Sequence, residues 1–136
     1  MRKFCNTLTF AFLALMLTFV SCKKDNSGEI IQTDPLLVGK WKLNATFLGT
    51  GYSDATWQNA AADDNRTLVF NSNGSVSGNA YPGYNNYAVK DSLLTLNGKA
   101  IDALKLLYTA KHDTLYLSPG GNVVCIEGCA VRYVKQ

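Results

Sequence analysis

The sequence is poor in the side chains on which most enzymes and metal sites depend. Its 136 residues include one histidine and four cysteines, and charged residues make up 17%. Cys5 lies in an expected leader and Cys22 is expected to be modified, and the two remaining thiols with one histidine do not build a four-ligand zinc site. The chain has no phosphate-binding loop, dinucleotide fingerprint or EF-hand spacing. We therefore expect no metal, no cofactor and no enzymatic activity.

The few groups that could act in catalysis are weakly placed. His112 stands beside Asp113 in a predicted hairpin turn, and no motif places a Ser or Cys for it to activate. A solvated turn histidine is therefore favoured over a general base. The adjacent acids Asp63 and Asp64 lie in a polar loop, where such side chains usually face water.

Long hydrophobic runs are confined to the first residues of the chain. Met1-Arg2-Lys3 is a short positive segment, and it is followed by an apolar run, TLTFAFLALMLTFV, that ends at Val20. This order is typical of a signal peptide, and the run is short for a membrane-spanning helix, which needs about 20 apolar residues. The sequence predicts a leader over residues 1–21.

The leader ends in Phe19-Val20-Ser21-Cys22. This segment resembles the lipobox of bacterial lipoproteins, although Phe19 departs from the aliphatic residue usual there. The resemblance implies that Cys22 becomes the lipidated first residue of a lipoprotein in the bacterial outer membrane, on its periplasmic face or at the cell surface. The alternative is an ordinary secreted protein in which Cys22 has no special role.

The residues after Cys22 are polar and contain too little apolar surface to pack. We expect residues 22–34 to form a flexible tether and residues 35–136 to form one folded domain. Lys23-Lys24-Asp25 resembles the export tags of some outer-membrane lipoproteins of Gram-negative bacteria, and a merely soluble linker is the equal alternative.

Charge of one sign is not in excess. The chain has 13 basic and 10 acidic residues, and loss of Arg2 and Lys3 with the leader leaves 11 basic residues and a net charge of +1. This balance gives no indication of nucleic-acid binding. About 100 residues suffice for one small domain, which we expect to be a monomer.

Two cysteines remain for the folded domain, because Cys5 leaves with the leader and Cys22 is expected to be acylated. Cys125 and Cys129 flank Ile126-Glu127-Gly128, with Gly128 at the left-handed position of a short hairpin loop. In an oxidising compartment such a pair usually forms a disulfide. A redox-active or metal-binding pair is the minor alternative.

No segment after the leader has a convincing helical period. In KWKLNATF, Trp41, Leu43, Ala45 and Phe47 alternate with polar residues and are expected to face the interior. KAIDALKLL fits either period and is expected to be a strand. Turn residues recur along the chain, at 71–74, 90–92, 111–113 and 118–121. About eight or nine short strands result, which predicts an all-β antiparallel sandwich or barrel.

A Gly two residues before a Trp in the first strand, and an Arg in the last strand, resemble the lipocalin signature. The matching residues are Gly39, Trp41 and Arg132. The resemblance implies that Gly39 permits a tight chain entry, Trp41 closes one end of the barrel, and Arg132 lies across the indole of Trp41.

The layout from Leu37 to Lys135 resembles the compact lipocalin-like domains of bacterial outer-membrane lipoproteins. It implies a small antiparallel up-and-down β-barrel. The run TLVFNSNGSVSGN also resembles META-type lipoproteins, a different small β fold, which we rank second.

An eight-stranded barrel holds side chains or one small ligand. Several residues are expected to fill it: Leu68, Phe70, Tyr87, Val89, Leu94, Leu96, Leu115 and Leu117. Aromatic residues on or near two predicted loops are expected to form a binding mouth: Tyr52, Trp57, Tyr81, Tyr84 and Tyr87. The alternative is that they fold back onto the core.

Two functions follow from these expectations. The first is a lipid-anchored carrier or sensor that binds a small apolar or amphipathic ligand at the barrel mouth. The second is an accessory or inhibitory protein with a filled barrel, which binds another envelope protein through its aromatic loops. Fold analogy supports the first, and a fold does not determine function.

Overall fold

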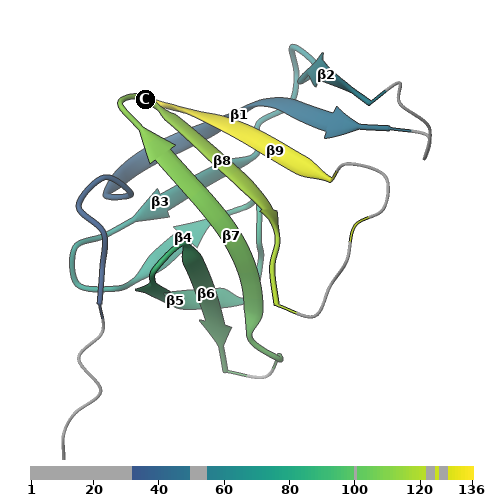
Figure 1. Ribbon diagram of the computed structural model, residues 1–136. Helices are drawn as coiled ribbons and strands as arrows, with labels where there is room; N and C mark the ends of the chain where they lie inside the picture. Colours follow the sequence, from purple (N-terminus) through teal and green to yellow (C-terminus); the bar gives the residue numbers. More distant parts are fainter. Residues whose placement is uncertain (1–31, 50–54, 100, 122–124, 126–128) are drawn as a thin grey trace, which may run out of the picture. The chain divides into compact units, whose positions relative to one another are not determined.

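The computed structural model describes residues 32–49, 55–99, 101–121, 125 and 129–136. The predicted leader, Cys22 and Tyr52 lie outside these residues. The described part of the chain forms nine antiparallel strands and no helix, so it has no helix that could span a membrane (Figure 1). The strands are β1 (Gly39–Leu48), β2 (Thr56–Asn59), β3 (Thr67–Phe70), β4 (Val76–Gly78), β5 (Tyr84–Lys90), β6 (Leu93–Gly98), β7 (Leu104–Lys111), β8 (Thr114–Pro119) and β9 (Ala130–Lys135).

The strands form one nearly closed up-and-down barrel. Neighbouring strands follow the order β4-β3-β1-β9-β8-β7-β6-β5, and β2 pairs with the second half of β1. The barrel approaches closure where Ser75 bridges to Asn86 and where the Tyr87 backbone N–H donates to the Gly74 carbonyl at 2.8 Å. The expected small antiparallel barrel of eight or nine strands is confirmed.

Tight turns connect three pairs of consecutive strands at the predicted places, whereas the turn predicted at 118–121 begins inside β8, which extends to Pro119. Asp91 and His112 begin the two-residue turns of the β5–β6 and β7–β8 hairpins, and both have a positive φ, 55° and 49°. Primed turns of this kind match the twist of the flanking strands. The predicted Asn71–Gly74 turn joins β3 to β4, and the Gly74 backbone N–H donates to the Asn71 carbonyl at 3.0 Å.

Side chains fill the interior of the barrel. All eight residues expected inside are buried, with exposed fractions of 6% or less, and Trp41, Leu43, Leu106 and Tyr133 join them. The Tyr87 hydroxyl donates to the Asn71 carbonyl at 3.0 Å, and its ring meets Phe70 edge-on. The interior therefore behaves as a packed core, and burial of each large apolar side chain contributes about 1.5–3 kcal/mol.

The segment before β1 packs against the barrel. Gln32 accepts a hydrogen bond from the Val89 backbone N–H at 2.8 Å, and Asp34 accepts one from the Tyr108 hydroxyl at 2.9 Å. Leu37 is fully buried, and its carbonyl accepts the Trp41 indole N–H at 2.7 Å. The last residues of the predicted tether thus contact the sheet.

Residues 49–65, one of the two loops expected to carry aromatic residues, contain the strand β2. Four register pairs join β2 to β1, from Ala45 with Asn59 to Leu48 with Thr56. All four residues of β2 are exposed. The strand therefore has no alternation of buried and exposed residues by which its sequence could have been recognised as a strand.

Candidate binding surface

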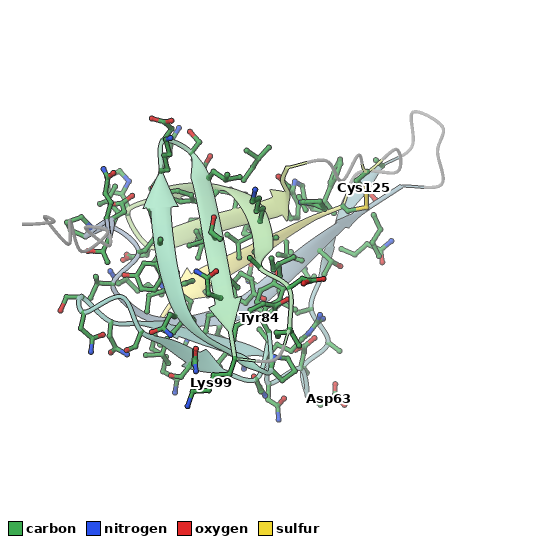
Figure 2. All side chains as sticks on the ribbon, turned by 90° about the horizontal axis from the view of Figure 1, so that it is seen from below. Asp63, Tyr84, Lys99 and Cys125 are labelled. Carbon is green, nitrogen blue, oxygen red and sulfur yellow. A yellow bond between two sulfur atoms is a disulfide. The ribbon has the colours of Figure 1, made fainter. Side chains whose placement is uncertain are left out.

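The described residues expected to form a binding mouth, Trp57, Tyr81, Tyr84 and Tyr87, do not form one exposed surface. Tyr87 has 1% of its surface exposed, so it fills the interior, as also expected, and cannot contribute to a mouth. Tyr81 and Tyr84 are partly buried against the core, and the Tyr84 hydroxyl donates to the Asp102 carbonyl at 3.2 Å. In Figure 2, Tyr84 is labelled low in the middle of the view and Cys125 towards the right.

Trp57 belongs instead to an aromatic patch on the outside of the sheet. Its ring centroid lies 5.2 Å from that of Phe47 and 5.7 Å from that of Tyr116. The Arg132 guanidinium carbon lies 5.2 Å from the Trp57 ring centroid, and Arg132 Nε donates to Asn44 Oδ1 at 2.8 Å. We call Phe47, Trp57, Tyr116 and Arg132 the outer patch.

A bulge in β1 creates this patch. The pairing of β1 with β9 shifts at Asn44, since Leu43 is opposite Tyr133 and Ala45 is opposite Arg132. An extra residue in one strand reverses which face the following side chains occupy. Ala45 and Phe47 therefore share the outer face with Arg132. Ala45 is fully buried there, as expected of it, whereas the expectation that Phe47 faces the interior was wrong.

A shallow hollow of about 350 Å³ adjoins the outer patch. Ser118 and Ala130 are small residues in its lining, which Leu107 and Tyr116 also form. Leu107 is 48% exposed, which is unusual for a leucine in a strand. The hollow opens on the outer face of β7 and β8, so it is separate from the packed interior.

The predicted contact between Arg132 and Trp41 is replaced by another. Lys135 Nζ lies 5.2 Å from the ring centroid of Trp41, whereas Arg132 lies on Trp57. Gly39 has a φ of 136°, and a β-carbon there would come within 2.7 Å of Lys135 Cε. The Gly-x-Trp pattern thus leaves room for the Lys135 side chain to reach across the indole.

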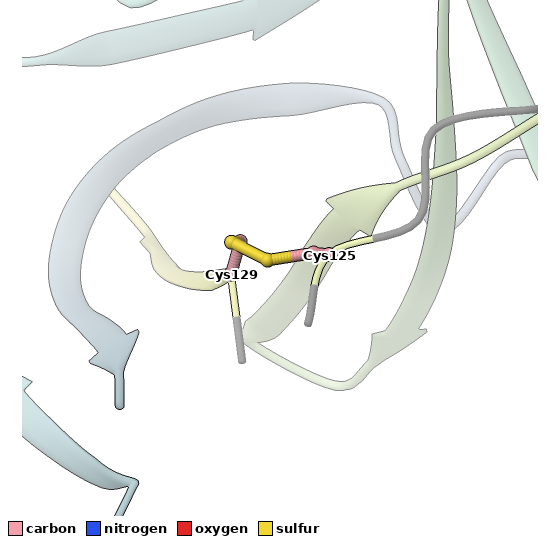
Figure 3. Close-up of a disulfide and its surroundings, with 2 residues drawn as sticks. All are labelled: Cys125 and Cys129. Atoms are coloured by element: carbon pink, nitrogen blue, oxygen red, sulfur yellow. A yellow bond between two sulfur atoms is a disulfide. The ribbon is translucent and has the colours of Figure 1, made fainter. Parts of the chain in front are cut away.

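The disulfide between Cys125 and Cys129 is present, as expected, with a Cα–Cα distance of 5.9 Å (Figure 3). Both cysteines lie in the connection between β8 and β9, and Cys129 comes directly before β9. Cys125 is not in a strand, so the bond does not join two paired strands as predicted. The expected conformation of Gly128 lies outside the described residues.

The polar groups of the described residues do not assemble a reactive centre. His112 is exposed in its turn, as expected, and no group of metal-ligating side chains occurs in the described part of the chain. Hydrogen bonds from Arg66 hold the pKa of the Asp64 carboxyl below its usual value. Burial raises the pKa of Tyr81 and Tyr133, so both phenols stay neutral to a higher pH than an exposed tyrosine does.

Sequence reasoning missed most of the outer patch. Tyr116 lies between the core residues Leu115 and Leu117, and that alternation already indicates an outward side chain. For Phe47, the alternation that starts at Trp41 predicts an inward side chain. The bulge at Asn44 reverses that direction, and the sequence of β1 does not reveal the bulge. The hollow depends on the register of three strands.

Comparisons with protein-family models, with curated proteins and with solved structures found no match to this chain.

Proposed function

We propose that this protein is a lipid-anchored binding protein of the bacterial envelope that holds another envelope protein on its outer patch. The observation that carries the proposal is the contrast between the two sides of the sheet. The interior is filled by its own side chains, while Trp57 remains 39% exposed within an aromatic cluster on the outside. Exposed aromatic and arginine side chains are typical anchors of protein interfaces.

The position of the patch along β1 supports this proposal. The N-terminal segment packs near the start of β1, where Leu37 meets Trp41, and the patch begins at Phe47 near the end of that strand (Figure 1). Six residues of extended chain between Trp41 and Phe47 span about 20 Å. The patch thus lies at the opposite end of β1 from the place where the segment before β1 packs.

The lipid anchor is a separate part of the proposal. It rests on the resemblance of the segment Phe19-Val20-Ser21-Cys22 to a lipobox. As separate parts of the proposal, the protein is a monomer and has neither enzymatic activity nor a cofactor. Metabolic labelling with a palmitate analogue tests the anchor, because the label should be incorporated into the native chain and be lost in Cys22→Ser. Equal labelling of both chains would contradict the anchor at Cys22.

Site-specific photocrosslinking in the native envelope tests the binding surface. Leu48 and Leu36 are both about half exposed, at 51% and 53%, and Leu48 pairs with Thr56 beside the patch whereas Leu36 precedes β1. A benzophenone amino acid at Leu48 should give a discrete polypeptide adduct that the same group at Leu36 does not give. The adduct should disappear in Trp57→Ala, and identical adducts from both positions would contradict the proposal.

A second candidate function is favoured by the hollow beside Leu107. Its volume of about 350 Å³ is at the lower end of the range for small-molecule sites, about 300–1,000 Å³. A small apolar or amphipathic ligand would then bind on the outside of the barrel. Leu107→Asp should abolish retention of such a ligand while leaving the crosslink from Leu48 intact.

A further inference from the structure

The strand β2 leaves one edge unpaired among the described residues. It pairs with β1 along its other edge, and the Ala60 backbone N–H donates to the Asn44 carbonyl at 2.8 Å in the same register. Hydrogen-bonded positions of an antiparallel pair recur at every second residue. Gln58 and Thr56 therefore bond to β1, and the backbone N–H and C=O groups of Trp57 and Asn59 point away from it.

This edge lacks two of the features that usually prevent strand pairing. Its sequence, Thr-Trp-Gln-Asn, contains no charged residue and no proline, and its one protection of the usual kind is that the strand is very short. The strand is short, and Trp57 and Asn59 offer two N–H and two C=O groups. Backbone hydrogen bonds alone would hold an added strand weakly, so its side chains must contribute as well.

The side chains on the adjacent face indicate which residues an added strand would carry. Trp57 presents an exposed aromatic surface next to the edge. Arg132 uses Nε for Asn44, and its guanidinium has further donors. The ion pair found among the described residues joins Arg66 to Asp64 and does not involve Arg132. The outer patch thus combines an apolar surface with a cation that lacks a carboxylate partner in the described part of the chain.

We propose that β2 is a docking edge for an extended segment of a partner protein, which adds as one strand to the sheet. The segment carries an apolar side chain that packs on Trp57 and, two residues away on the same face, a carboxylate that pairs with Arg132. This inference rests on the proposed function and specifies how the partner is held. It goes further because it predicts main-chain pairing at Trp57 and Asn59.

Two synthetic peptides of about nine residues provide the probe. One repeats the pattern Val-Thr-Glu-Thr, so that Val and Glu lie on one face of the strand and Thr on the other. The other peptide carries Lys in place of Glu. Nuclear magnetic resonance of the mature domain should show saturable shifts of the Trp57 and Asn59 amides with the Glu peptide. The Lys peptide should bind at least about tenfold more weakly, because its lysine is repelled by Arg132 where the glutamate of the first peptide is attracted. Arg132→Gln should remove that difference.

The variants Asn59→Pro and Asn59→Ala separate main-chain pairing from side-chain contact. Proline removes an N–H that points away from β1, which an edge strand tolerates, and alanine keeps that N–H. Asn59→Pro should weaken binding of the Glu peptide at least about tenfold, whereas Asn59→Ala should bind as the native chain does. A Glu peptide with N-methyl groups on alternate residues gives the same test without altering the protein, and it should not bind.

The outcomes distinguish this inference from the proposed function. Loss of the Leu48 crosslink in Asn59→Pro, and its retention in Asn59→Ala, supports strand addition. Retention in Asn59→Pro with loss in Trp57→Ala overturns strand addition and leaves the patch as the binding surface. Absence of any shift at Trp57 and Asn59 with the Glu peptide also overturns it. A concentration-dependent dimer of the chain alone, abolished in Asn59→Pro, would assign the edge to a second copy and contradict the inference.

Discussion

The guanidinium carbon of Arg132 lies 5.2 Å from the ring centroid of Trp57. Asn44, the bulged residue of β1, accepts a hydrogen bond from Arg132 Nε at 2.8 Å. The bulge thus holds the cation that covers one face of the exposed tryptophan. This relationship links a local irregularity of one strand to the candidate binding surface.

Arg132→Ala should loosen this arrangement without unfolding the barrel. Loss of the hydrogen bond to Asn44 and of the cation–π contact is expected to cost about 1–2 kcal/mol of unfolding free energy. The fluorescence of Trp57 should shift to longer wavelength, because water replaces the guanidinium. Lys135→Ala is the matched control, since it removes the cation from Trp41. An equal shift of the Trp57 emission in both variants would contradict the contact between Arg132 and Trp57.

Gly78→Ala should be among the most destabilising single changes. Gly78 has a φ of 116°, and a β-carbon there would overlap the Thr67 carbonyl oxygen across the β3–β4 pair. Strain at such a φ alone costs about 1–3 kcal/mol, and the backbone contact adds to it. Urea unfolding should show a loss of at least about 2 kcal/mol, against less than about 0.5 kcal/mol for the exposed neighbour Ser77→Ala.

The two aromatic residues Tyr87 and Trp57, both expected at the mouth, should differ in their effect on stability. Tyr87 is 1% exposed and Trp57 is 39% exposed. Tyr87→Ala should cost about 3–5 kcal/mol because it leaves a cavity in the core, whereas Trp57→Ala should cost less than about 2 kcal/mol. Thermal unfolding measures both, and a larger loss for Trp57→Ala would show that its main role is to cover the core.

Stability should fall at alkaline pH because of Tyr108. Burial, followed by its hydrogen bond to Asp34, raises the pKa of Tyr108 to about 12. The unfolded value is about 10, so the stabilisation is complete below about pH 10 and is lost as pH rises towards 12. Tyr108→Phe should lose about 1 kcal/mol at neutral pH and show a smaller fall between these pH values. Equal alkaline slopes in both chains would contradict this role.

Reduction of the disulfide should have a modest effect. Cys125 and Cys129 are four positions apart, and closing so short a loop restricts the unfolded chain by about 2 kcal/mol. The double variant with Ser at both positions should unfold at a slightly lower temperature and keep the barrel signature in circular dichroism. Unfolding of the whole barrel in this variant would contradict the prediction, because it would show that the disulfide contributes more than the loop-closure entropy of the unfolded chain.

Much of the barrel could be predicted because its signals are local. Alternation in β6 and β8 identifies Leu94, Leu96, Leu115 and Leu117 as interior residues, and short polar turns mark the hairpins. These patterns need no information about distant strands. The up-and-down topology then follows from sequential antiparallel pairing.

The candidate site could not be predicted in the same way, because it depends on register. The bulge at Asn44 moves Phe47 to the outer face, and it becomes visible in the pairing of β1 with β9. Because of this shift, Arg132 contacts Trp57, and Lys135 contacts Trp41 where Arg132 was expected. A strand with four exposed residues, such as β2, has no hydrophobic alternation to reveal it.

Native mass spectrometry of the mature domain, purified from its own envelope, tests most directly whether recognition occurs outside the barrel. Our account predicts the mass of the polypeptide with one disulfide and the covalent lipid on Cys22, and no molecule retained in the interior. Any small ligand should be lost in Leu107→Asp. A stoichiometric apolar ligand that remains bound in both Leu107→Asp and Trp57→Ala would require a cavity among the core side chains. That result would contradict the filled barrel and restore the carrier hypothesis.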